Sequence, residues 1–311
     1  MNKFTIIAYL SAIILFLSGC QTSNQPLSLE SVQPADFQDP KKIHALVSIL
    51  PQTEFVKSIG GDNVEVVSLV REGFNPATYE PTPDQLKLIT QADIYFLIGH
   101  VAFEKQYLQK IIATNPDLVI VDTSEGINLR QIDNHGHEDL QEDSEAQSGD
   151  DPHIWLSPVL IQTQIEHIYQ GLVNLQPENI EKFGQNKRQY SQKLQDLHQE
   201  LTQSLTPFKG QTFFVYHPAF GYLADQYGLN QEHIEIDGKE PSAADITRIT
   251  KLAKNENIHV IFVQKQFSTQ AAEAIAEEIN GSVIALDPLN PHYIDNMYSI
   301  SQTISRNLSN Q

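Results

Sequence analysis

The stretch that decides the fold, "PENIEKFGQNKRQYSQKLQDLHQELTQSL" at residues 177–205, has the pattern of one long amphipathic helix. At 1.5 Å per residue, a helix of about 30 residues spans roughly 40 Å, which is longer than one small domain. Such a helix suits a stiff strut between two lobes, although a long surface helix of a single domain would show the same pattern. Its apolar side chains recur at three-, four- and seven-residue spacing: Ile180, Phe183, Tyr190, Leu194, Leu197, Leu201 and Leu205.

Short apolar runs lie on both sides of this helix and alternate with helical patterns. Val, Ile and Phe dominate these runs, as expected for strands that are buried on both faces of a parallel sheet. The alternation predicts the α/β class, with two lobes that each hold a mainly parallel sheet flanked by helices. The expected strands are 44–50, 64–70, 94–98, 118–121, 212–216, 233–236, 260–263 and 283–286.

The two halves of the chain echo each other. Residues 45–70 and residues 212–236 both read as strand, loop with a proline, short helix with an aromatic side chain, glycine turn and strand. This repeat favours two similar lobes. The expected boundaries are an N-terminal lobe at 41–176, a linking helix at 177–206 and a C-terminal lobe at 207–311.

The first 20 residues, "MNKFTIIAYLSAIILFLSGC", have the pattern of a secretory signal. Their last four residues resemble the lipobox of bacterial lipoproteins, which implies that cleavage leaves Cys20 as a lipidated N-terminus. A plain signal peptide with a chance cysteine is the alternative. Residues 21–40 are polar, contain several prolines and lack periodicity, so we expect a flexible tether to the membrane. The folded part is then extracytoplasmic and lipid-anchored to the cell envelope.

Composition limits the chemistry of the mature chain. Cys20 is the only cysteine, so a metal site must use His, Asp or Glu, and no disulfide can form. The formal net charge of −19 argues against nucleic acid as a partner and is compatible with cations. In open parallel sheets, ligands bind beyond the carboxyl ends of the strands. Candidate metal ligands in such places are His100, His217, Asp287, Asp122 and Asp237, together with His153 in the loop "DDPHIWLSP".

Several ordered motifs carry a resemblance to a known family. "DPHIWLSP" at 151–158, "VYHPAFGYLADQYGL" at 215–229 and "ALDPL" at 285–289 resemble the metal-binding receptors of bacterial ABC importers, the ZnuA-like, cluster A-I solute-binding proteins. "YEPTPDQLKLITQADIYFLIG" at 79–99 is similar to the same family. The resemblance implies two α/β lobes joined by a rigid helix, with one divalent metal ion between them. It also implies a monomeric receptor that is not an enzyme and that delivers metal to an ABC permease with its ATPase.

The resemblance places His153, His217 and Asp287 at ligand positions of the family. Histidine at position 217 favours Zn²⁺, because manganese receptors often have glutamate there, and imidazole suits zinc. Ala77 stands where the family usually has its first histidine. Either the site has three protein ligands and a water, or another residue fills the gap. We expect His100, with Glu80, Glu104 and His292 as weaker candidates. Gln264 stands where glutamate is common, and no function is inferred from it.

An acidic tract extends from Asp133 to Asp151 and contains eight acidic residues, His135 and His137, but no Lys or Arg. Nothing periodic or apolar anchors it, so we expect a mobile loop. Many zinc receptors of the family have a His- and acid-rich loop at this point. The resemblance implies accessory metal capture by His135 and His137, and a solvated insertion with incidental histidines is the alternative.

Three other functions compete with a zinc receptor. The same fold could bind manganese or iron. A zinc hydrolase would need an open coordination position and a base, but no HExxH motif is present and no obvious base accompanies the histidines. An adhesin is the third possibility, because some members of the family have been assigned surface adhesion.

Overall fold

The first half of the chain forms a four-stranded parallel sheet in the order β2-β1-β3-β4. The computed structural model describes residues 37–132, 149–236 and 238–310. The strands are β1 (Ile43–Val47), β2 (Val64–Ser68), β3 (Ile94–Leu97) and β4 (Val119–Asp122), and the intervening helices are α1 (Pro51–Gly60), α2 (Pro83–Gln91) and α3 (Ala102–Thr114).

The second half repeats this topology as a parallel sheet in the order β6-β5-β7-β8. Each sheet therefore places its first, second, third and fourth strands in equivalent positions, which confirms the repeat. The strands are β5 (Thr212–Val215), β6 (Asn230–His233), β7 (Val260–Gln264) and β8 (Ser282–Leu286). The helices are α6 (Gly221–Tyr227), α7 (Ala243–Asn255), α8 (Gln270–Glu278) and α9 (Tyr293–Leu308).

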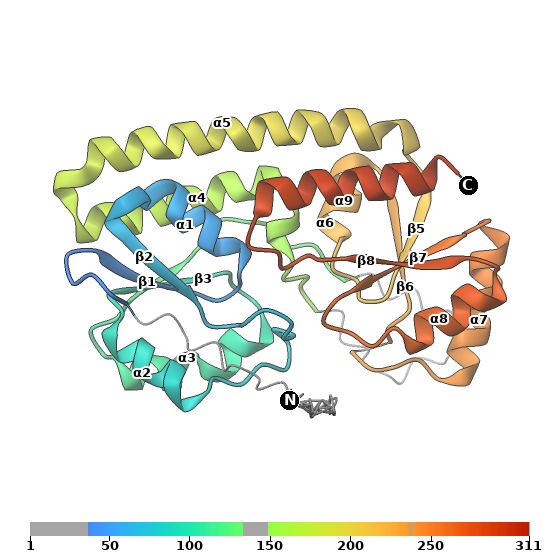
Figure 1. Cartoon of the computed structure of the whole chain (residues 1–311), viewed down its shortest axis with the longest axis horizontal. Helices are drawn as coiled ribbons and strands as arrows, with labels where there is room; N and C mark the ends of the chain where they lie inside the picture. The colour runs from blue at the N-terminus through green and yellow to red at the C-terminus, as the bar shows by residue number, and fades with distance from the viewer. Residues whose placement is uncertain (1–36, 133–148, 237, 311) are drawn as a thin grey trace, which may run out of the picture. The chain divides into compact units, whose positions relative to one another are not determined.

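Helix α5 (Ile180–Leu205) is the long helix expected from the sequence, and short 3₁₀ turns precede it at Pro177–Asn179 and follow it at Thr206–Phe208. It packs against α1 and α4 (Pro158–Leu175) from the first half, and against α6 and α9 from the second half. In Figure 1 this helix runs above both sheets. The prediction of two α/β lobes joined by one long helix is confirmed.

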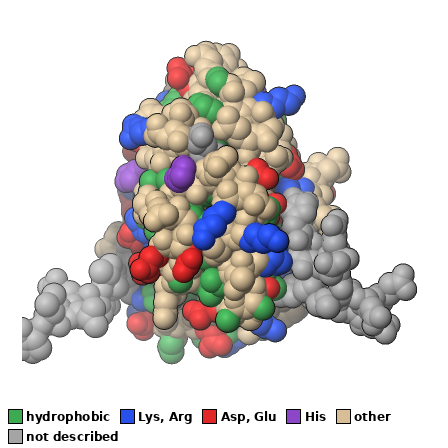
Figure 2. Space-filling view, turned by 90° about the vertical axis from the view of Figure 1, so that its right-hand side faces the viewer, with side chains coloured by type: hydrophobic (Ala, Val, Ile, Leu, Met, Phe, Trp, Pro, Cys, Tyr) green, Lys and Arg blue, Asp and Glu red, His purple; other side chains and the backbone are tan. Residues whose placement is uncertain are grey.

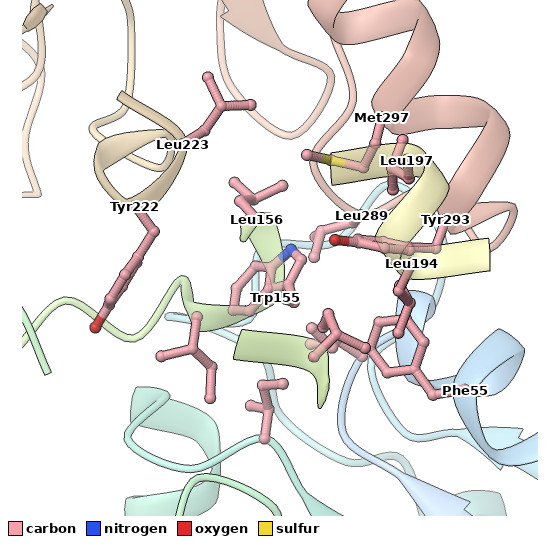
Figure 3. Close-up of a cluster of buried hydrophobic side chains, with 14 of the residues drawn as sticks. Phe55, Trp155, Leu156, Leu194, Leu197, Tyr222, Leu223, Leu289, Tyr293 and Met297 are labelled. Atoms are coloured by element: carbon pink, nitrogen blue, oxygen red, sulfur yellow. The ribbon is translucent and has the colours of Figure 1, made fainter. Parts of the chain in front are cut away.

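One hydrophobic cluster extends through both lobes. It includes Phe96 of β3, Leu197 of α5 and Phe213 of β5, which are all fully buried or nearly so. Figure 3 shows Trp155 in the middle of this cluster, with side chains of α6 on one side and side chains of α5 and α9 on the other. The described residues accordingly fall within a single compact unit. Because tightly packed interiors resist deformation, the shared core should hold the two lobes in a narrow range of orientations.

Local sequence signals located most element boundaries, with one error. The sequence patterns at 82–85 and 242–245 predict capping boxes, and both boxes, Thr82 with Gln85 and Ser242 with Asp245, are present at the starts of α2 and α7. The expected strand 233–236 is displaced, because β6 spans Asn230–His233. This strand lies at an edge of the sheet and is only partly buried, so it does not need the apolar residues that mark a central strand.

Several sequence-based predictions lie outside the described residues: the signal sequence with its lipidated Cys20, most of the expected tether, the accessory histidines His135 and His137, and the candidate ligand Asp237. Among the residues that the structure does describe, none of the helices combines the length and hydrophobicity needed to cross a bilayer. Figure 2 shows the side of the molecule that holds the second sheet, where acidic and basic side chains both appear and hydrophobic side chains are scattered.

Candidate metal site

A cavity of about 240 Å³ lies where loops from both lobes meet. The first lobe contributes the loop around Ala77, the turn after β3 and the loop that leads into α4. The second lobe contributes the segments that follow β5, β7 and β8, so the cavity lies beyond the carboxyl ends of the parallel strands. Residues that line it include Asn75, Ala77, His100, His153, His217, Phe267 and Leu289.

His153 is held by the carboxylate of Asp151. Asp151 Oδ1 accepts hydrogen bonds from the backbone N–H of His153 at 2.9 Å and from its Nδ1 at 2.7 Å. Asp151 is fully buried and also binds Arg130 Nη1 at 2.9 Å. Burial opposes ionisation of Asp151, but His153 and Arg130 outweigh it and hold the pKa of this carboxyl below its usual value. Since a carboxylate only accepts, Nδ1 of His153 is the donor, and in the neutral imidazole Nε2 is the nitrogen with the lone pair.

His217 repeats this arrangement in the second lobe. It follows β5, and its Nδ1 donates to Glu235 Oε2 at 2.5 Å. Glu235 is buried, and it follows the neighbouring strand β6. The imidazole stacks on Phe267, with ring centroids 4.8 Å apart. Nε2 of His217 is therefore the atom that faces the cavity with its lone pair.

Gln264 fixes the backbone that carries His217. Its side-chain oxygen accepts from the His217 N–H at 3.1 Å, and its side-chain nitrogen donates to the His217 carbonyl at 2.7 Å. A glutamate could accept the first bond but, when ionised, could not donate the second. Gln264, to which the sequence assigned no function, thus restrains the backbone on both sides of the His217 Cα atom.

The two Nε2 atoms face each other across the lobe boundary at 3.2 Å. Two zinc–nitrogen bonds of 2.0–2.1 Å at a tetrahedral angle would place their nitrogens about 3.3 Å apart. Both imidazoles also have the carboxylate partner that usually orients a metal-binding histidine. The pair therefore has the spacing, tautomer and support that a tetrahedral zinc site requires.

His100 lines the same cavity, as the sequence suggested. It adopts a left-handed backbone conformation with φ of 67°, directly after Gly99 with φ of 81°. The carboxylate of Glu104 holds this turn from below, because it accepts from the N–H groups of Ile98 at 2.7 Å and Gly99 at 2.9 Å. Burial raises the pKa of Glu104 to about 7.

The other candidates for the missing ligand do not line the cavity. Glu104 is buried beneath the turn that carries His100, and its oxygens are engaged by Ser48 and the two backbone N–H groups. Glu80 and His292 lie elsewhere on the surface. Ala77 does line the cavity, on the wall that the first lobe forms. Its methyl group cannot coordinate a metal ion, so this wall provides no ligand at position 77.

Asp287 is placed differently from the histidines. It follows β8, but its neighbours Pro288 and Leu289 line the cavity while Asp287 itself does not. Its Oδ2 lies 3.2 Å from Lys265 Nζ, and its Oδ1 accepts from the N–H of Leu289 at 3.0 Å. Across the part of the chain that the structure describes, no three His, Asp or Glu side chains are gathered as a ready-made metal site.

Sequence reasoning missed the carboxylates that orient the two histidines. Asp151 was grouped with the acidic tract, but it is fully buried and belongs to the site. The feature of the sequence that could have indicated this role is the position of Asp151 two residues before His153. Glu235 lies between two isoleucines, in a segment that the sequence assigned to a strand. Nothing local distinguishes it, because its contact with His217 depends on the pairing of β5 with β6.

Replacing Glu235 by glutamine should weaken zinc binding by about tenfold, because outer partners of metal-binding histidines typically contribute 10- to 100-fold in affinity. Glutamine keeps the shape and can accept the Nδ1 hydrogen bond, but it removes the negative charge. Competition with a fluorescent zinc chelator measures the change, and exposed Glu240→Gln is the matched control. An unchanged affinity would show that Glu235 does not support the ligand.

The fold and the facing histidines define a class: a two-lobed α/β protein that can bind a divalent metal ion between the carboxyl ends of two parallel sheets. The family profile described as "Zinc-uptake complex component A periplasmic" matches residues 46–307. The chain therefore belongs to the ZnuA family.

Individual relatives agree with this assignment. The chain is 30% identical to the "High-affinity zinc uptake system protein ZnuA" of Bacillus subtilis strain 168 over 299 residues, which cover 93% of this chain and 89% of the relative. It is 29% identical to the "Zinc-binding lipoprotein AdcA" of Streptococcus pneumoniae strain R6, and the match covers 93% of this chain and 56% of that relative.

Solved structures show the same fold. A crystal structure of ZnuA has a TM-score of 0.78 and 37% identity, and the match covers 86% of this chain and 99% of that chain. A zinc-bound ZnuA mutant that lacks its residues 138–173 has the same score and identity, with 87% and 99% covered.

Proposed function

We propose that the protein binds Zn²⁺ outside the cytoplasm and delivers it to the permease of an ABC importer that its ATPase drives. The observation that carries this proposal is the pair of Nε2 atoms 3.2 Å apart, each on an imidazole whose Nδ1 is bound by a buried carboxylate. Membership of the ZnuA family and the zinc-binding names of the relatives support it.

In this proposal His153, His217, His100 and Asp287 are the metal ligands. The two supported histidines form the initial binding pair, and His100 approaches from the same cavity. Asp287 joins after its carboxylate turns from Lys265. Binding exchanges the water of the ion for imidazole and carboxylate, and no covalent chemistry is needed. His135 and His137 are proposed as accessory capture residues.

We also propose that Cys20 anchors the chain to the membrane through a lipid and that the receptor acts as a monomer. The lipobox-like residues 17–20 support the anchor, and the streptococcal relative is named a lipoprotein. Labelling with a radioactive fatty acid tests it: Cys20→Ser should abolish incorporation and release the protein from the membrane fraction.

The experiment that tests the receptor function combines binding and transport. Purified protein should bind one Zn²⁺ ion, and manganese in excess should not displace it. Cells that lack the gene should take up zinc poorly at low external zinc, and the wild-type gene should restore uptake. Preferential binding of manganese would favour the manganese receptor, and absence of metal binding would favour the adhesin.

Zinc affinity should fall as the pH drops, because the metal requires neutral imidazoles. Burial lowers the pKa of His153 below its ordinary value of 6.5, although the bound carboxylate of Asp151 and the charge of Glu235 oppose this effect and His217 reinforces it. Protons therefore compete with zinc at His153 only below about pH 6.5, so its contribution is constant between about pH 8 and pH 7. Zinc titrations at several pH values measure this profile, and an increase in affinity toward pH 5 would contradict it.

A further inference from the structure

Lys265 and Asp287 lie at the ends of neighbouring parallel strands. Gln264 ends β7, Leu286 ends β8, and these two residues are register partners. The next residue of each strand therefore emerges at the same edge of the second sheet. There Lys265 Nζ lies 3.2 Å from Asp287 Oδ2.

This ion pair holds the carboxylate beside the metal cavity rather than in it. The N–H of Leu289 engages the other carboxylate oxygen at 3.0 Å, so both oxygens have partners. The side chain of Asp287 is only 12% exposed, whereas that of Lys265 is 53% exposed and can move into solvent. To reach a metal ion at His153 and His217, the carboxylate must weaken its contact with the lysine.

We propose that Lys265 competes with Zn²⁺ for the Asp287 carboxylate and thereby lowers the zinc affinity of the site. The inference rests on the proposed function, because it requires Asp287 to be a ligand. An ammonium group and a divalent cation repel each other at one carboxylate, so binding of the metal displaces the lysine. When the metal leaves, Lys265 offers the carboxylate a partner again, which favours release to a permease.

Affinity measurements on the full chain test the competition. Lys265→Gln should bind zinc about three- to fivefold more tightly, a size that fits a partly exposed ion pair. Lys251→Gln, which removes an exposed lysine of α7, is the matched control and should leave affinity unchanged. Asp287→Asn should weaken binding, and adding Lys265→Gln to it should give no gain, because the interaction partner is gone.

Each other outcome overturns the inference in a distinct way. An unchanged or weaker affinity in Lys265→Gln would show that the lysine does not compete. If Lys265→Gln raised zinc affinity by the same factor in the Asp287→Asn background, the gain would come from the change in net charge and not from release of Asp287. An Asp287→Asn variant with wild-type affinity would show that Asp287 is not a ligand, while the receptor function stands. Failure of the wild-type protein to bind zinc would instead refute the proposed function.

A second readout does not depend on affinity. Acylation of Lys265 by an amine-reactive reagent, followed by mass spectrometry, reports whether its ammonium is paired. Saturating zinc should increase the labelling of Lys265 and leave that of Lys251 unchanged. Equal labelling of Lys265 with and without zinc would contradict displacement of the lysine.

Discussion

His153→Ala should lower zinc affinity by roughly 1,000-fold, because structural zinc sites have binding free energies of about 10–16 kcal/mol that about four ligands share. One ligand then contributes about 2.5–4 kcal/mol, and each 1.4 kcal/mol is a factor of ten. The expected loss is at the upper end because His153 is fully preorganised: Asp151 sets both its tautomer and the direction of its Nε2.

Isothermal titration or competition with a chelator measures this loss, and thermal unfolding shows whether the variant remains folded. His259→Ala is a matched control, because His259 is exposed and precedes β7 away from the cavity lining. A folded His153→Ala protein that retains the zinc affinity of the wild-type protein would refute the proposed site. His217→Ala should behave in the same way, since its environment repeats that of His153.

His100→Ala should weaken zinc binding by roughly 100-fold, at the lower end of what one ligand contributes. His100 lines the cavity and emerges from a turn that the Glu104 carboxylate holds, but within the described residues no hydrogen bond orients its ring. The ring must therefore lose rotational freedom on binding, which reduces the net gain.

Ala77→His provides the complementary test. In the His100→Ala background it should restore most of the affinity, because position 77 faces the same cavity from the wall where the family usually has its histidine. In the wild-type background it should change affinity little, since His100 already supplies the ligand. An unaffected His100→Ala variant, combined with a tenfold or larger gain from Ala77→His alone, would show that water occupies this coordination position.

Three neighbours from the second lobe hold the side chain and backbone of His217. Gln264 ends β7, Glu235 follows β6 and Phe267 follows β7, so all three contacts of His217 come from one edge of the second sheet. A rigid sheet edge thus fixes one ligand, and the loop from Asp151 to Trp155 fixes the other. Trp155 reinforces the contact between lobes by donating to the Pro288 carbonyl at 2.8 Å.

Much of the architecture could be predicted from the sequence because its signals are local. Central strands are marked by apolar runs, α5 by its helical period, and α2 and α7 by their capping boxes. The edge strand β6 was misplaced because a partly buried edge does not require an apolar run. His100 and His217 were located because the ends of parallel strands gather at one edge, whereas His153 was located through the motif "DPHIWLSP".

The sequence by itself determined the α/β class, the repeat of two sheets, the long helix between them and the histidines at the metal cavity. Only the tertiary structure decided that Asp151 and Glu235 orient two of those histidines and that Lys265 holds Asp287 aside. The reason is physical. Helical period, strand burial and capping depend on residues a few positions apart, whereas these contacts depend on which strands pair and on how two lobes pack around a shared core.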